Sequence, residues 1–106
     1  MPYEYAISFE IKSDATYGER YRSLIQEIAK TPGSTGFWAE TTAFILIRSN
    51  EAIEDLEHRL YYKSKLLSSK DKLLVIDHVN NVAVARGPFE YPNTLKAHFK
   101  TCLFPK

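Results

Sequence analysis

The fold is decided by the stretch YEYAISFEIK, residues 3–12, which alternates over its whole length. A period of two predicts a β-strand, and one face of this strand is strongly apolar. The other face is small in its middle, at Ala6 and Ser8, and ends on the carboxylate of Glu10. We therefore expect the central strand of a small sheet, with Glu10 at its C-terminal end. The apolar face consists of Tyr3, Tyr5, Ile7, Phe9 and Ile11.

The bulk composition narrows the class of protein. A chain of 106 residues predicts a single domain, residues 1–106, with one modest core. Its formal net charge of +1 excludes a global electrostatic attraction to nucleic acid or membrane, so such binding needs a local patch. One cysteine, Cys102, cannot form an internal disulfide and favours a reducing compartment. Without a membrane-length apolar run or a signal-peptide pattern, we expect a cytoplasmic protein with no membrane partner.

Two helical stretches follow from the spacing of apolar residues. Residues 17–28 carry an apolar stripe at helical spacing, and Ser13 or Asp14 is expected to cap this helix. The sequence TPG at 31–33 should end it. A second helix is expected after the caps Ser49 and Asn50, with acidic residues first and basic residues last, as the helix dipole favours. Its buried stripe is Ile53, Leu56, Leu60 and Leu67.

The remaining stretches predict strands and a tail. Residues 37–47 fit either a hairpin or one long strand bent near 40–42. Residues 72–78 predict a core strand, and the turn at Asn80-Asn81 leads into a short return strand, 82–86. Beyond it, Asn93 can cap a short helix at 94–101.

This order predicts an α+β fold, a ferredoxin-like two-layer sandwich (βαββαβ) with an extra C-terminal strand and tail. The core would span residues 3–86 and the tail residues 87–106. Residues 44–47 and 73–76 are apolar on both faces, so the sheet face without helices also needs a cover. The tail offers little for this purpose, and a second copy of the chain is the economical cover. We therefore expect a homodimer, with residues 82–86 adding a strand to the partner or to a shared edge.

The pattern resembles the CRISPR-associated protein 2 family and its relatives, the virulence-associated protein D toxins. The resemblance covers roughly residues 3–80 and rests on three stretches: Phe9-Glu10-Ile11 closing the first strand, the aromatic and apolar run 38–47, and KDKLLVIDH at 70–78. Residues 82–86 are similar to the extra C-terminal strand of the family. The family has an aspartate where this chain has Glu10.

The resemblance implies a homodimer that handles nucleic acid. Some members are metal-dependent nucleases, and others are scaffolds in an adaptation complex. The partners implied are a CRISPR adaptation protein or an antitoxin. Glutamate reaches one methylene further than aspartate, so the metal geometry at Glu10 would differ from that of the family.

Glu10 is the candidate catalytic and metal-binding residue. Its carboxylate would hold Mg²⁺ together with the Glu10 of a second copy across a two-fold axis, because one carboxylate binds Mg²⁺ weakly. The alternative is a solvated strand end or an ordinary ion pair. Candidate nucleic-acid-binding residues are basic, and the alternative for them is an ordinary solvated surface. They are Lys12, Arg20, Lys63, Lys65, Lys70 and Lys72.

Two further groups of polar residues are expected to be structural. Asp77 and His78 are neighbours on a strand and point to opposite faces, so they cannot act together directly. His98 and Cys102 share a helical face but supply only two ligands, short of a zinc site.

The sequence thus leads to a metal-dependent endonuclease, or a nuclease-like nucleic-acid-binding subunit, as the first functional hypothesis. The alternative is a non-enzymatic dimeric module that binds nucleic acid or protein, in which Glu10 is structural.

Overall fold

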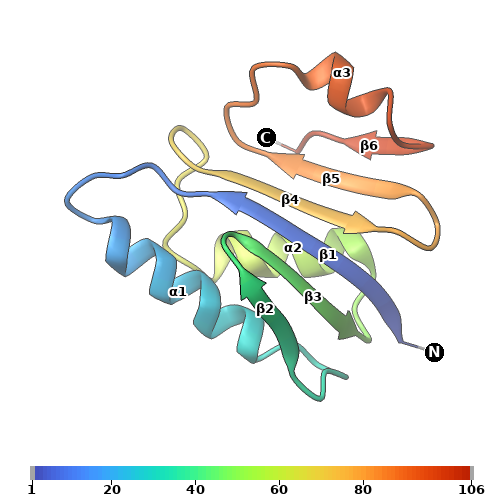
Figure 1. Cartoon of the computed structure of the whole chain (residues 1–106), viewed down its shortest axis with the longest axis horizontal. Helices are drawn as coiled ribbons and strands as arrows, with labels where there is room; N and C mark the ends of the chain where they lie inside the picture. Colours follow the sequence, from blue (N-terminus) through green and yellow to red (C-terminus); the bar gives the residue numbers. More distant parts are fainter. Residues whose placement is uncertain (1, 106) are drawn as a thin grey trace.

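The computed structural model describes residues 2–105, and all its strands join one sheet (Figure 1). The helices are α1 (Tyr17–Ala29), α2 (Ile53–Tyr62) and α3 (Pro92–Lys96). None of these helices is both long enough and apolar enough to cross a membrane. The strands are β1 (Tyr3–Glu10), β2 (Phe37–Thr41), β3 (Phe44–Ser49), β4 (Lys72–Asp77), β5 (Val82–Arg86) and β6 (Thr101–Leu103).

The six strands are ordered β2-β3-β1-β4-β5-β6. All neighbours are antiparallel except β5 and β6, which are parallel. The first strand lies inside the sheet, with Ile7 opposite Ile45 on one side and Val75 on the other. The alternating stretch at residues 3–10 is therefore the central strand that the sequence predicts.

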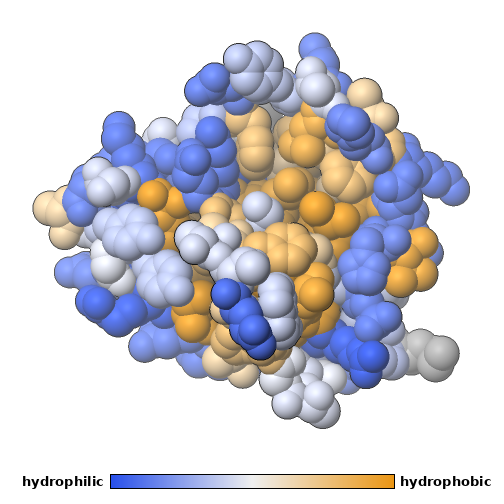
Figure 2. Space-filling model, viewed as in Figure 1, coloured by the Kyte–Doolittle hydropathy of each residue, from blue (hydrophilic) through white to orange (hydrophobic). Residues whose placement is uncertain are grey.

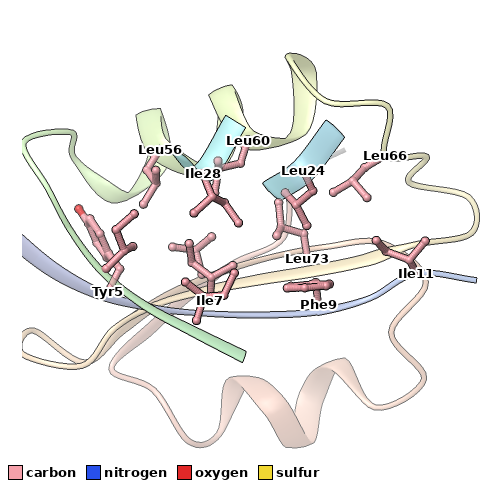
Figure 3. Close-up of a cluster of buried hydrophobic side chains, with 13 residues drawn as sticks. Tyr5, Ile7, Phe9, Ile11, Leu24, Ile28, Leu56, Leu60, Leu66 and Leu73 are labelled. Atoms are coloured by element: carbon pink, nitrogen blue, oxygen red, sulfur yellow. The ribbon is translucent and has the colours of Figure 1, made fainter. Parts of the chain in front are cut away.

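One face of the sheet carries the main core, under α1 and α2. The odd-numbered side chains of β1 point to these helices, and Ile7 is fully buried among Leu24 of α1 and Leu56 of α2 (Figure 3). Figure 3 also shows α3 on the opposite side of the sheet. Helical periodicity creates this core, because α1 and α2 each bury one apolar stripe.

The opposite face is covered over only part of its width. The segment that contains α3 lies on β4, β5 and β6, where Leu95 and Phe99 pack against Ala83 and Ala85. These two alanines are small, so the segment can approach the sheet closely. Cys102 of β6 is buried in the same cluster, and this burial raises the pKa of its thiol.

The predicted ferredoxin-like two-layer sandwich is wrong, although the α+β class is right. The sheet has six strands and is mixed, and a third helix lies on its second face. The reason lies in residues 87–105, which were expected to be a tail with little covering capacity. They supply the apolar side chains Phe89, Leu95 and Phe99 and the strand β6 instead.

The prediction for residues 82–86 is half right. They form β5, with the expected bounds, but β5 pairs with β4 on one side and β6 on the other. β5 is therefore flanked on both sides within the chain, with β6 pairing with Val82–Val84, and it is not the free edge that the predicted strand addition to a partner requires. The stretch 37–47 is a hairpin rather than one bent strand, with Ala43 at φ 57° in its turn.

The predicted helix caps are also wrong. The residues at the cap positions are Thr16 for α1 and Ala52 for α2, and neither side chain makes a capping hydrogen bond. The last helix, α3, begins earlier than expected and ends at Lys96.

Candidate functional site

Glu10 lies at the C-terminal end of β1, on the face opposite α1 and α2. Its side chain is 73 % exposed, and its Oε1 lies 3.3 Å from Nζ of Lys72, which is its partner in the register with β4. Within residues 2–105, no group of three or more His, Cys, Asp or Glu side chains is placed to hold a metal ion. Each chain thus offers one accessible carboxylate here, already paired with a lysine.

The candidate lysines lie around the end of the sheet where β1 ends and β4 begins. The loop after β1 and the loop after α2 meet there, since the backbone N–H of Lys12 donates to Asp71 at 3.0 Å (Figure 1). Carboxylates offset part of the positive charge: Lys70 lies 3.0 Å from Asp14, and Lys65 lies 3.9 Å from Glu19. Lys12 and Lys63 are both exposed.

Arg20 differs from the other predicted nucleic-acid-binding residues. Its side chain is only 2 % exposed, and Nε donates to Oδ2 of Asp71 at 3.0 Å. The same guanidinium donates to Asp14 at 2.9 Å and to the carbonyl of Lys12 at 2.7 Å. Arg20 therefore ties the two loops together beneath the surface, and little of its guanidinium is exposed for the predicted contact with phosphate.

The pairs Asp77/His78 and His98/Cys102 were expected to be structural. Asp77 is buried and accepts hydrogen bonds from the backbone N–H groups of Val79 and Asn80, so it shapes the β4–β5 turn. Burial alone would raise the pKa of Asp77, but the hydrogen bonds from Asn80 and Val79 hold it below its ordinary value. His98 is exposed while Cys102 is buried.

The sequence predicts a dimer on the open sheet face, and in the structure the chain leaves only half of that face uncovered. This uncovered half is formed by β1, β3 and β2, where Ala6 lies opposite Leu46 and Leu46 lies opposite Trp38. Trp38 and Leu46 are each 40 % exposed, and Phe44 is half-buried. Figure 2 shows apolar side chains gathered in the middle of this face and hydrophilic ones around its rim.

Charged pairs of both signs lie at the two ends of this half-face. At one end Nε of Arg48 donates to Oε1 of Glu4 at 2.7 Å, and at the other end Lys72 pairs with Glu10. Both Glu4 and Arg48 are well exposed, so neither carries a buried charge. The period of two along each strand is the signal that places Trp38 and Leu46 on the open face. Their neighbours Phe37, Ile45 and Ile47 point to the other face.

No family model, curated protein or solved structure matches this chain. The resemblance to the CRISPR-associated protein 2 family therefore stays a prediction.

Proposed function

We propose that this protein is a non-enzymatic binding module that forms a homodimer through the uncovered half of its open sheet face. The observation that carries this proposal is the exposure of Trp38 and Leu46, 40 % each, on a sheet face whose other half the chain covers itself. Contiguous exposed apolar surface on a sheet, rimmed by polar residues, marks an interaction site. Its burial would supply most of the driving force for association.

Charge complementarity favours a second copy as the occupant. In a two-fold interface the same patch serves both subunits, so each positive group must find a negative group of the same patch. The half-face meets this demand because Glu4 and Arg48 stand at one end and Glu10 and Lys72 at the other. The net charge of +1 per chain also produces little repulsion between two copies.

The experiment for the dimer is sedimentation at micromolar concentration with matched surface variants. Leu46→Lys places a charge in the middle of the half-face and is expected to give monomers with unchanged circular dichroism. Leu67→Lys is the control, because Leu67 is 43 % exposed but lies in the loop after α2. A parent protein that sediments only as a monomer, or a Leu46→Lys protein that still dimerises, contradicts the proposal.

The second candidate function is nucleic-acid handling, with metal-dependent endonuclease activity at Glu10. The observation that favours it is that the lysines of two loops surround the strand end that carries Glu10. In a dimer, Mg²⁺ would relieve the repulsion between two Glu10 carboxylates and activate a water for attack on a phosphodiester. A CRISPR adaptation protein or an antitoxin would be the partner, in the cytoplasm, where Cys102 stays reduced.

Salt and charge variants test the second candidate. Four phosphate contacts would lower affinity about 10²-fold between 50 and 200 mM salt, and reversing Lys63, Lys65, Lys70 and Lys72 to glutamate should abolish binding. Glu10→Gln should lose Mg²⁺-dependent cleavage while the protein remains a dimer. If the parent binds no nucleic acid and cleaves none with any divalent metal, only the binding module remains.

A further inference from the structure

A groove between α1 and the β2–β3 turn is lined by aromatic rings. Its volume is about 330 Å³, and its wall includes Phe9 of β1 with Tyr17 and Tyr21 of α1. The rings of Tyr17 and Tyr21 stack with centroids 6.1 Å apart and planes 8° apart, and Phe9 meets Tyr21 at 6.1 Å and 48°. The three rings thus form one continuous aromatic surface, in which Tyr17 and Tyr21 are nearly parallel and Phe9 is tilted against Tyr21.

This surface is only partly used by the fold. Phe9 is 8 % exposed and belongs to the main core, whereas Tyr17 and Tyr21 are 41 % and 39 % exposed. Tyr17 and Tyr21 are residues i and i+4 of α1, so they lie on the same side of the helix, one turn apart. The aromatic surface therefore continues from the core out to solvent.

The charge of the groove points to a cation. Among the described residues, the side chains that line it include one carboxylate, Glu40, and no lysine, arginine or histidine. Aromatic faces carry negative quadrupole charge and attract cations that lie within about 6 Å of the ring centre. Because Tyr17 and Tyr21 are 41 % and 39 % exposed, part of each ring stays open to such a cation.

Other rings in the same chain already hold cations of the protein itself. The guanidinium of Arg86 lies 4.3 Å from the ring centre of Tyr61, and the ammonium of Lys72 lies 6.0 Å from that of Phe89. Among residues 2–105, no such contact is seen for Phe9, Tyr17 or Tyr21. Among the described residues, these three rings and Glu40 thus line a potential cation-binding site into which no lysine or arginine side chain of the chain itself extends.

We propose that this groove binds a trimethylammonium group, as carried by a choline-type small molecule or by a trimethylated lysine of another protein. A methylated ammonium is large and cannot donate hydrogen bonds, so it suits aromatic faces better than a hydrated lysine ammonium does. The Glu40 carboxylate supplies the long-range attraction. The groove lies between α1 and the β2–β3 turn and shares Phe44 with the half-face, but Tyr17, Tyr21 and Glu40 are not among the residues of the proposed dimer contact, so the variants separate the two proposals.

The experiment compares a cation with its neutral isostere. Calorimetric titration of the full chain uses choline, and 3,3-dimethylbutan-1-ol serves as a probe of the same shape without charge. Choline is expected to bind at least about tenfold more tightly, because the quadrupole acts on charge and not on shape. Trimethyllysine amide and lysine amide form a second pair of probes, and tighter binding of trimethyllysine than of choline identifies the protein source.

Variants assign the binding to the groove. Tyr21→Leu and Tyr17→Leu should each weaken choline binding about tenfold or more, Tyr21→Phe should keep it, and Glu40→Gln should weaken it several-fold. Tyr3→Leu is the control, since Tyr3 is 39 % exposed, like Tyr21, at the far end of β1. Circular dichroism verifies that each variant is folded. Equal affinity for the neutral isostere, unchanged affinity in Tyr21→Leu, or no binding of either trimethylammonium probe overturns the proposal.

Discussion

Single residues hold the ends of the elements together, and Arg20 does so most clearly. Its guanidinium donates to Asp71, to Asp14 and to the carbonyl of Lys12, so one buried side chain joins the loop after β1 to Asp71, which lies 51 positions after Arg20 in the sequence. This engagement also explains why Asp14 does not cap α1. Its carboxylate accepts from Arg20, Lys70 and the backbone N–H of Thr16 instead.

The first prediction concerns the pH dependence that Asp14 produces. Hydrogen bonds from Arg20 and Lys70 hold the pKa of Asp14 well below its ordinary value. Because the pKa is lower in the folded state, this stabilisation is complete above the unfolded pKa of about 3.9 and is lost as the pH falls toward the folded pKa. The unfolding free energy of the parent should therefore decline below about pH 4, as urea titrations at several pH values would measure.

The same urea titrations on Asp14→Asn show how much of the acid dependence comes from Asp14. Glu90→Gln is the control, because it removes one exposed carboxylate elsewhere in the chain. Asp14→Asn should be less stable at neutral pH and should lose less of its remaining stability on acidification. A variant with the same acid slope as the parent would contradict the assignment to Asp14.

The second prediction concerns Gly87, directly after β5. It has φ 119°, and a Cβ at this position would lie 2.1 Å from the carbonyl oxygen of Asp71. Gly87→Ala should therefore lower the free energy of unfolding. The positive φ costs an alanine about 1–2 kcal/mol, and the overpacking against Asp71 costs about 1–3 kcal/mol more. Gly36→Ala is the matched control, because Gly36 has φ 134° but no heavy atom within 4 Å of its Cβ position. Equal losses in urea unfolding of the two variants would show that the close approach is unimportant.

At the scale of elements, α2 is attached to β5 by a buried ion pair. Arg86 donates through Nε to Oε2 of Glu57 at 2.7 Å and through a second nitrogen to Oε1 at 2.9 Å. The side chains are 4 % and 2 % exposed, and the guanidinium lies against the rings of Tyr61 and Tyr62. The pair therefore fixes which part of α2 faces the C-terminal half of the sheet.

The third prediction is that this pair gives specific placement rather than net stability. Glu57→Leu leaves a buried guanidinium without its carboxylate and should cost about 3–5 kcal/mol, while Glu57→Leu with Arg86→Met should recover most of that loss. A double-mutant cycle followed by urea unfolding measures the coupling. If the double variant is as unstable as Glu57→Leu, the ion pair itself supplies the stability.

The elements themselves were largely predictable, because they follow from local periodicity. The spacing of apolar residues predicted the central strand, both long helices and β5, and the structure contains all of them. The strand β6 was not predictable, since three residues at 101–103 carry no period, and it exists only because β5 offers an edge. The position of Arg20 was not predictable either, because its partner Asp71 is 51 residues away.

At the scale of the whole molecule, one face of the sheet carries the main core under α1 and α2, and the other face is covered on one half. The sequence predicted correctly that two-sided apolar strands need cover on both faces, but it assigned all of the second cover to another copy. The chain supplies half of that cover through α3 and β6. The uncovered half-face and the aromatic groove are the two surfaces at which we propose binding.

The fourth prediction tests the role of the C-terminal segment. A chain ending at Arg86 lacks α3 and β6 and exposes Leu74 and Ile76 together with Ala83 and Ala85. It should sediment as large aggregates and bind hydrophobic dyes, because β5 becomes an unprotected apolar edge. A chain ending at Leu103 keeps both elements and should behave like the parent. Unchanged dye binding by the shorter chain would show that the segment is dispensable.

The late position of this cover has a consequence for the order in which the sheet forms. The turn at Asn80 and Asn81 joins β4 to β5 directly, whereas β6 begins only at Thr101. Pairings between residues close in sequence form first, so β5 is expected to pair with β4 before β6 pairs with β5. Until β6 docks, Ala83 and Ala85 lie on a bare sheet edge, and a refolding intermediate at this stage is an expected client of holdase chaperones.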